Sequence, residues 1–188
     1  MDKATAEEVT KLFAEVVIAP GYADGVLEIL ETKKNRIILR MKDTTRCPKQ
    51  FRSMLNGVAV QDRDLKVGGR DTEMKTVTRA VPTEAQMKDM IFANILVKHS
   101  KSNAIVLAKD NTILASGVGQ TSRVDALKQA IEKAKGFGFD LKGAVMASDA
   151  FFPFADCVEI AHAEGIDAVI QPGGSVRDNE SCLLYTSD

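Results

Sequence analysis

The segment NAIVLAKDNTILASG, residues 103–117, predicts a β-hairpin. Two strand-like apolar runs flank Asp110-Asn111, a pair of residue types that favours the tight turn between antiparallel strands. Helices and short buried strands are expected to follow it in alternation. The expected elements are a helix over 121–135, a strand over 144–148, a helix over 156–165 that Gly165 ends, and a strand over 168–171.

The same alternation is found towards the N-terminus. PTEAQ (82–86) is a strong helix start, because Thr83 and Gln86 have the spacing of a capping box, and its apolar positions run on to Lys98. A charged, glycine-containing stretch over 63–75 is the best candidate for a linker. Before it, the expected elements are a helix over 3–14, a strand over 16–19, a helix over 22–33 and strands over 36–41 and 57–62. This alternation favours an α/β fold, with helices packed on a layered sheet.

The composition is typical of a globular protein. Hydrophobic residues make up 45% and charged residues 27% of the 188, which excludes wholesale disorder. The 25 Lys and Arg nearly balance the 26 Asp and Glu, which argues against a nucleic-acid-binding domain. No apolar run reaches the length of a membrane span, and the charged N-terminus has no signal-peptide core, so no membrane partner is expected.

The cysteines and histidines argue against disulfides and transition metals. Cys47, Cys157 and Cys182 are far apart and odd in number, which predicts a reducing, cytoplasmic environment. With two histidines, His99 and His162, and no CxxC pair, we expect no zinc. No histidine is near Cys157 in the sequence, so this residue is expected to be a packed core thiol rather than a nucleophile.

An aromatic segment, SDAFFPFADC (148–157), follows the strand expected over 144–148. Ligand sites of α/β proteins lie beyond the carboxyl ends of strands, where Phe rings can stack on a flat heterocycle and Asp149 or Asp156 can orient its polar edge. The alternative is a hydrophobic plug that closes the sheet, with Asp149 capping the next helix. From the residues alone, both interpretations stay open.

Polar segments occur at the ends of other expected elements. In KHSKSNA (98–104), the side chains could hold a substrate or a monovalent cation, although Lys98 and His99 also suit a helix C-terminus through its dipole. Asn103 stands at a strand start, where its amide is expected to point to the ligand side.

Two further segments contain glycine beside expected helix starts. In GQTSR (119–123), Arg123 opposes the dipole of the helix it begins, which hints at a carboxylate or phosphate partner. PGGS (172–175) would let backbone N–H groups approach an anion, and an ordinary turn explains it equally well.

Several ordered motifs together resemble a known family. SNAIVLAKD, GQTSRVDA, ASDAFFPF and QPGGSVRDNES, with VVIAPGY and FRSMLNGVAVQDRDL upstream, are similar to the AICAR transformylase domain of the bifunctional AICAR transformylase/IMP cyclohydrolase family. The resemblance covers about residues 3–181 and implies tandem cytidine-deaminase-like α/β layers with mixed sheets. The first layer would be partial and end at about residue 70, and the second would span 71–181. CLLYTSD (182–188) departs from the family and is interpreted as a foreign or frameshifted tail.

The resemblance also implies a reaction. Formyl would pass from the cosubstrate 10-formyltetrahydrofolate to the amine of AICAR, a ribonucleotide, in purine biosynthesis. The full-length protein would be a homodimer and also an IMP cyclohydrolase. By position, Asn103 matches the asparagine that contacts the carboxamide and the reacting amine, which makes it the candidate catalytic residue. The substrate contacts implied in addition are Glu15, Arg123 and Phe151. The implied folate pocket comprises Val124, Pro153, Phe154, Asp156, Gly173 and Gly174. The implied potassium site comprises Val97, Ser100, Ser102 and Asp149.

One departure bears on activity. The family's lysine–histidine pair, which includes the histidine thought to manage the proton of the attacking amine, is matched neither by Lys98-His99 nor by His162. We therefore expect this chain to be inactive alone. The alternative function is a catalytically silent α/β module that binds a nucleotide or a folate. A zinc deaminase is excluded, because its ligand set needs an HxE together with a PCxxC, and the sequence contains no PCxxC.

Overall fold

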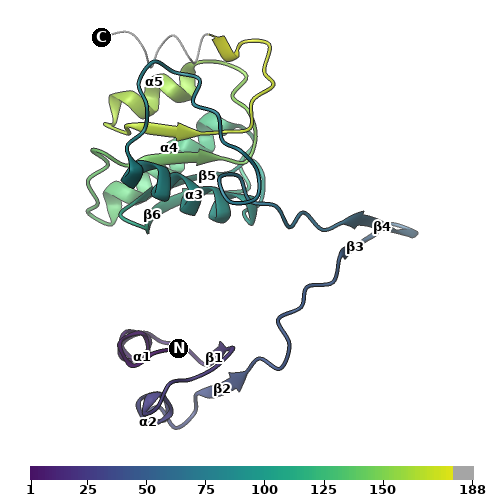
Figure 1. The fold of residues 1–188 in the computed structure, drawn as a ribbon, viewed down its shortest axis with the longest axis vertical. Helices are drawn as coiled ribbons and strands as arrows, with labels where there is room; N and C mark the ends of the chain where they lie inside the picture. Colours follow the sequence, from purple (N-terminus) through teal and green to yellow (C-terminus); the bar gives the residue numbers. More distant parts are fainter. Residues whose placement is uncertain (180–188) are drawn as a thin grey trace. The chain divides into compact units, whose positions relative to one another are not determined.

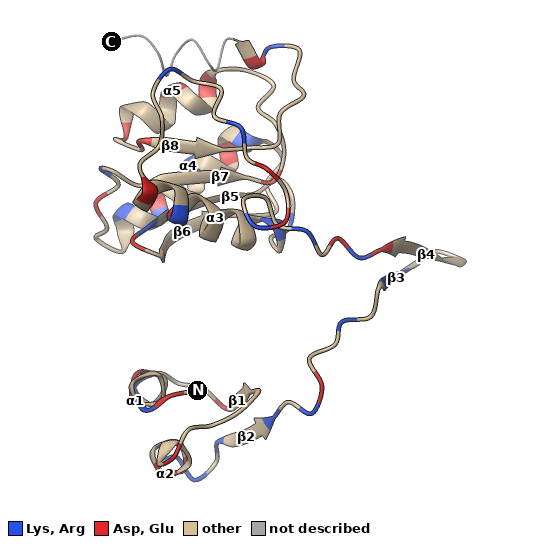
Figure 2. Cartoon of the chain, viewed as in Figure 1, with Lys and Arg blue, Asp and Glu red and all other residues tan. Residues whose placement is uncertain are grey.

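The computed structural model describes residues 1–179, so the expected tail at 182–188, with Cys182, lies outside the described residues. The chain divides into two compact units, Met1–Asp64 and Leu65 onwards, and each is described by itself. Acidic and basic residues are interspersed along both (Figure 2), in line with a net charge of −1. None of the described helices has both the length and the apolar character needed to cross a bilayer.

The first unit begins with a small α/β layer (Figure 1). Its elements are α1 (Lys3–Lys11), β1 (Val16–Ala19), α2 (Val26–Leu30) and β2 (Ile37–Arg40). The two strands are parallel, with Val16 opposite Ile37. A small core forms from Ala6, Val17, Val26 and Leu30. The alternate residues of the strands stay exposed, namely Val16, Ile18, Ile37 and Leu39.

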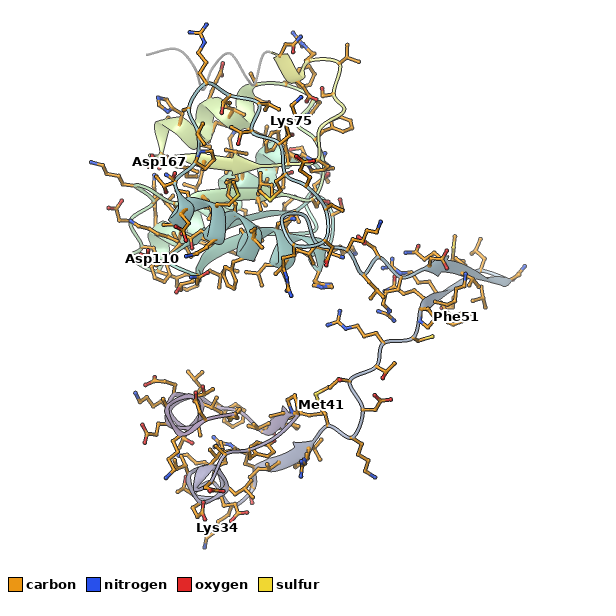
Figure 3. All side chains as sticks on the ribbon, viewed as in Figure 1. Lys34, Met41, Phe51, Lys75, Asp110 and Asp167 are labelled. Atoms are coloured by element: carbon orange, nitrogen blue, oxygen red, sulfur yellow. The ribbon has the colours of Figure 1, made fainter. Side chains whose placement is uncertain are left out.

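A hairpin of β3 (Lys49–Met54) and β4 (Gly57–Asp62) completes the first unit. The sequence predicted only the second of these strands, because KQFRSM mixes polar and apolar residues without a clear alternation. Most side chains of the hairpin are exposed, and Phe51 (labelled in Figure 3) is 63% exposed. Cross-strand backbone pairing, rather than a core of its own, therefore defines this segment.

The second unit is built on one four-stranded mixed sheet. Its elements are α3 (Glu84–Lys98), β5 (Ile105–Lys109), β6 (Thr112–Gly117), α4 (Arg123–Gly136), β7 (Val145–Ser148), α5 (Asp156–Ala163) and β8 (Ala168–Ile170). The strand order is β6-β5-β7-β8. β5 is antiparallel to both of its neighbours, and β7 is parallel to β8. The α/β fold with mixed sheets that the sequence predicted is confirmed.

Helices cover both faces of this sheet, which explains why its central strands are apolar throughout. α3 packs against β5, β7 and β8, whereas α4 packs against β6 and β5. Alternate residues of β5 divide between two cores: Ile105 and Leu107 join the side of α4 and α5, and Val106 and Ala108 join the side of α3.

Local signals in the sequence account for the element boundaries. The Oγ atom of Thr83 accepts a hydrogen bond from the Gln86 N–H at 3.2 Å, and the Gln86 Oε1 accepts one from the Thr83 N–H at 2.9 Å, which is the predicted capping box. Ser122 caps α4 by accepting from the Asp125 N–H at 3.1 Å. Gly165, at φ +80°, follows the end of α5 as predicted.

The turn of the predicted hairpin is fixed by a residue from α3. Asp110 and Asn111 both have positive φ, at 52° and 54°, which suits a tight turn between antiparallel strands. The buried carboxylate of Asp89 accepts both of their N–H groups, at 2.9 and 2.7 Å. α3, which packs on one face of the sheet, therefore holds the turn between β5 and β6.

Gly117, the last residue of β6, is required by its contact with α4. A Cβ atom at this position would lie 1.9 Å from the carbonyl oxygen of Ala126. We expect Gly117→Ala to lower the free energy of unfolding by about 3 kcal/mol, because strand and helix would have to separate. Urea denaturation measures this change in the free energy of unfolding. The matched control is Gly136→Ala in α4, where no atom outside the local helix backbone and the two neighbouring residues lies within 4 Å of the added Cβ, and a neutral or stabilising result is expected there. Equal effects of the two substitutions would contradict the assignment.

Candidate functional site

The candidate site lies at one edge of the sheet of the second unit, namely the edge formed by strand ends and not by an outer strand. β5 is antiparallel to β6 and β7, with Ile105 opposite both Gly117 and Ser148, so the start of β5 lies beside the ends of these two strands. The end of β8 lies next to that of β7. Segments that are far apart in the sequence, around residues 103, 123, 149 and 171, therefore meet here.

Asn103 precedes β5 and has an amide group whose orientation is fixed by chemistry. Its Nδ2 donates to the carbonyl oxygens of Gln120 and Thr121, at 3.0 and 3.2 Å. A carbonyl can only accept, so the NH2 must face these two groups and cannot exchange places with the oxygen. The Asn103 Oδ1 is left to accept a hydrogen bond from a ligand. Sequence reasoning selected Asn103 but could not assign this polarity.

Arg123 and Asp149 face each other across the edge. Arg123 begins α4 and Asp149 directly follows β7, and the Arg123 Nη2 lies 3.8 Å from the Asp149 Oδ1. Their side chains are 19% and 13% exposed. The predicted carboxylate partner of Arg123 is thus Asp149. The Arg123 Nε is buried and has no hydrogen-bond partner in the described part of the chain.

The aromatic segment is divided between the core and the surface. Phe152 is fully buried in the core, as a plug would be, while Phe151 and Phe154 are 42% and 52% exposed. The Phe152 N–H donates to the Oε1 of Gln171 at 2.6 Å, which ties this segment to the end of β8. Asp149 does not cap α5: the residue before that helix is Ala155, which makes no side-chain cap. The alternative role of Asp149 as a helix cap is therefore wrong, because its carboxylate is turned towards the start of β5.

The glycine loop after β8 folds around an acidic side chain. Gly174 has φ +119°, and its N–H donates to the Asp178 Oδ2 at 2.8 Å. The Arg177 guanidinium lies over the ring of Phe154, 5.2 Å from its centre, which brings the two ends of the candidate folate pocket together. Sequence reasoning missed Gln171 and Asp178, although both adjoin the PGGS motif.

The family described as AICARFT/IMPCHase bienzyme matches residues 1–133. The chain belongs to this family.

Relatives agree along nearly the whole chain. The Bifunctional purine biosynthesis protein PurH of Bacteroides thetaiotaomicron is 65% identical over 179 residues, which are 95% of this chain and 35% of that protein. Proteins of the same name from Clostridium perfringens and Aquifex aeolicus are each 48% identical, over 96% of this chain and 34% and 35% of their own lengths. The chain thus spans about a third of the curated relatives it matches.

The residues that the family resemblance implies as potassium ligands come from the end of α3, from the segment that follows it, and from the residue after β7. Ser102 donates its hydroxyl to the Asp149 carboxylate, whereas the Ser100 hydroxyl donates to the carbonyl of Leu96 at 2.9 Å. Val97 is buried, and its carbonyl accepts the Ser100 N–H at 3.0 Å. The atoms of these residues that would coordinate the cation are all oxygens, the ligand atom that potassium takes. Within residues 1–179, no group of three or more His, Cys, Asp or Glu side chains is arranged to hold a metal ion.

The remaining implied residues are placed as follows. In the first unit, Glu15 precedes β1 with an exposed side chain, and its carbonyl accepts the Ile37 N–H at 2.7 Å. In the second unit, Val124 packs half-buried against the α4 side of the core. Asp156 accepts the Cys157 N–H at 2.8 Å, and Pro153 and Gly173 are exposed.

Cys157 is a core thiol, as predicted. It is fully buried, and burial together with the negative charge of Asp156 raises the pKa of its thiol from 9.0 to about 12. His99 and His162 are exposed at the ends of α3 and α5. No imidazole is therefore in place to activate the sulfur.

Burial predicts that Cys157 resists alkylation. In a Cys47→Ser/Cys182→Ser background, iodoacetamide at pH 8 should label it at least about 100-fold more slowly in the native chain than in urea, because the folded state holds the proton. Below pH 9 both states are protonated, so this thiol leaves stability unchanged. Between pH 9 and 12 only the unfolded state ionises, and stability should fall as pH rises. Fast native labelling would contradict the assignment; the exposed Cys47, kept alone in a matched variant, is the positive control.

Proposed function

We propose that the chain is part of a formyltransferase of purine biosynthesis, which moves the formyl group of 10-formyltetrahydrofolate to the amine of AICAR. Family membership supports this. The observation that carries it is the amide of Asn103, fixed with its Oδ1 free, at the same edge as Arg123 and the exposed ring of Phe151.

The chemistry of the acceptor explains what these residues would do. The amine of AICAR is a weak nucleophile, because its lone pair is delocalised into the ring and the carboxamide. An amide oxygen that accepts one of its N–H groups would orient the amine towards the formyl carbon. Asn103 would fill this role, while Arg123 would hold the nucleotide and Phe151 would stack on its imidazole ring.

The folate would lie on the other side of the reacting amine. Its pocket would be formed by Val124, Pro153, Phe154, Asp156, Gly173 and Gly174, in which the Arg177–Phe154 contact fixes one wall. Potassium would be held by Val97, Ser100, Ser102 and Asp149 and would supply a fixed positive charge. We propose that the full-length protein is a homodimer that also carries IMP cyclohydrolase activity.

A base must come from outside these residues. The attacking amine has to lose a proton. An amide does not titrate, and arginine stays protonated in proteins. Both carboxylate oxygens of Asp149 already accept hydrogen bonds from the protein, from Ser102 and Ala104. The described edge accordingly supplies binding and orientation.

The division between orientation and binding can be tested in the full-length protein. Asn103→Ala should lower kcat about 100-fold, because the amine is no longer aimed, and should change KM little. Arg123→Ala should raise the nucleotide KM about tenfold, because it removes a charged contact. Steady-state formyl transfer measures both, with Lys128→Ala, on the exposed side of α4, as the control. An unchanged kcat in Asn103→Ala would refute its role. Absence of formyl transfer in the full-length wild type would refute the proposed function.

The 188-residue chain should show no formyl transfer by itself, because the lysine–histidine pair that the family resemblance implies is matched neither by Lys98-His99 nor by His162. Product formation should be undetectable under conditions in which the full-length protein turns over. Activity in the isolated chain would contradict this account of the proton. A full-length protein that binds AICAR and folate but transfers nothing would instead identify the silent binding module.

A further inference from the structure

The carboxylate of Asp149 contacts two separate segments at the candidate site, residues 102–104 and the start of α4 at Arg123. Its Oδ1 accepts the Ala104 N–H at 3.0 Å, and its Oδ2 accepts the hydroxyl of Ser102. The main chain of Asp149 adds a third contact to the same segment, since its N–H donates to the carbonyl of Ala104 at 3.3 Å. Ala104 is thus held at both its N–H and its C=O by one residue.

Asn103 lies between the two residues that Asp149 holds. The main chain of Asn103 is paired with Gln120 on the opposite side, with both N···O distances at 3.3 Å, and its amide donates to the carbonyls of Gln120 and Thr121. The backbone around Asn103 is therefore fixed from two directions. Loosening the Asp149 side would let the amide leave the carbonyls that determine its polarity.

The same carboxylate faces Arg123. The separation of 3.8 Å exceeds a hydrogen bond, so the guanidinium is held by charge and keeps donors for a ligand. With 13% of the Asp149 side chain exposed, water screens this attraction only partly.

We propose that Asp149 is a positioning residue, which fixes Asn103 through hydrogen bonds to its two neighbours and Arg123 through its charge. The kinetic consequences rest on the proposed function, whereas the structural consequence does not. We refer to the contacts of Asp149 with Ser102, Ala104 and Arg123 as the Asp149 clamp.

Three substitutions separate the hydrogen bonds from the charge. Asp149→Asn can keep both side-chain bonds, since its Oδ1 still accepts from Ala104 and its NH2 can donate to the Ser102 oxygen, but the charge facing Arg123 is lost. Ser102→Ala removes one bond and keeps the charge. Asp149→Ala removes the side-chain bonds and the charge together.

These differences predict distinct kinetics for the full-length protein. Asp149→Asn should raise the nucleotide KM about tenfold and leave kcat within about twofold. Ser102→Ala should lower kcat about fivefold at unchanged KM. Asp149→Ala should lower kcat about 100-fold and raise KM as well. The matched control is Asp110→Asn at the far end of β5, where asparagine suits the positive φ and no change is expected.

A second measurement does not depend on activity. In the ¹H–¹⁵N spectrum of the 188-residue chain, the side-chain NH2 of Asn103 should be protected from solvent exchange. That protection should persist in Asp149→Asn and be lost in Asp149→Ala. If the wild-type full-length protein transfers no formyl group, the proposed function fails and this measurement still decides the clamp.

The outcomes that would overturn the proposal are specific. A folded Asp149→Ala protein with wild-type kcat, or with undiminished protection of the Asn103 NH2, would do so. So would equal losses of kcat in Asp149→Asn and Asp149→Ala. If withdrawing potassium from the wild type reproduces the whole loss and Asp149→Ala adds none, the residue acts as a cation ligand alone. Should Asp149→Ala fail to fold, Ser102→Ala and Asp149→Asn give the same decision.

Discussion

Antiparallel pairing of β5 with β7, in the register that sets Ile105 opposite Ser148, determines where the other parts of the second unit lie. Both strands are buried on both faces, so neighbouring residues of β5 enter different cores, Ile105 with α4 and Val106 with α3. A slip of one residue would exchange the two sets of side chains, and isoleucine and leucine would be forced into the face where alanines meet α3. Packing on both sides therefore specifies the register strongly.

This register has a consequence at the edge of the sheet. Polar main-chain groups of residues 103 and 104 lie just beyond the ladder, and burial makes an unpaired N–H costly there, by about 1–3 kcal/mol. Asp149, one residue past β7, is placed so that its carboxylate reaches the Ala104 N–H at 3.0 Å. The opposite side of the same segment is satisfied by Gln120. The demand for hydrogen bonds at the end of the sheet thus accounts for the contacts on both sides of Asn103.

Much of the fold could be predicted, because local signals and the core agree. The capping box of Thr83 and the apolar run 105–108 each determine their own element, and the structure confirms both. β3 was missed because its residues show no periodicity, and only pairing with β4 makes it a strand. The residues of the site were selected from motifs and resemblance, but their contacts depend on register. Asp149 and Ala104 are 45 positions apart, and no local pattern shows that one holds the other.

The polar groups left at this edge are complementary in kind. Asn103 offers an acceptor, its Oδ1, since its NH2 is committed to two carbonyls. Arg123 offers a donor, since its buried Nε has no partner in the described part of the chain and its Nη2 meets only a charge. Buried polar groups are almost always paired in folded proteins, so the buried Arg123 Nε is a donor that the proposed ligand would use. Such a molecule needs an N–H group for Asn103 and an anionic or carbonyl oxygen for Arg123. An aminoimidazole carboxamide ribonucleotide carries both, which is our reason for proposing it here rather than an apolar ligand.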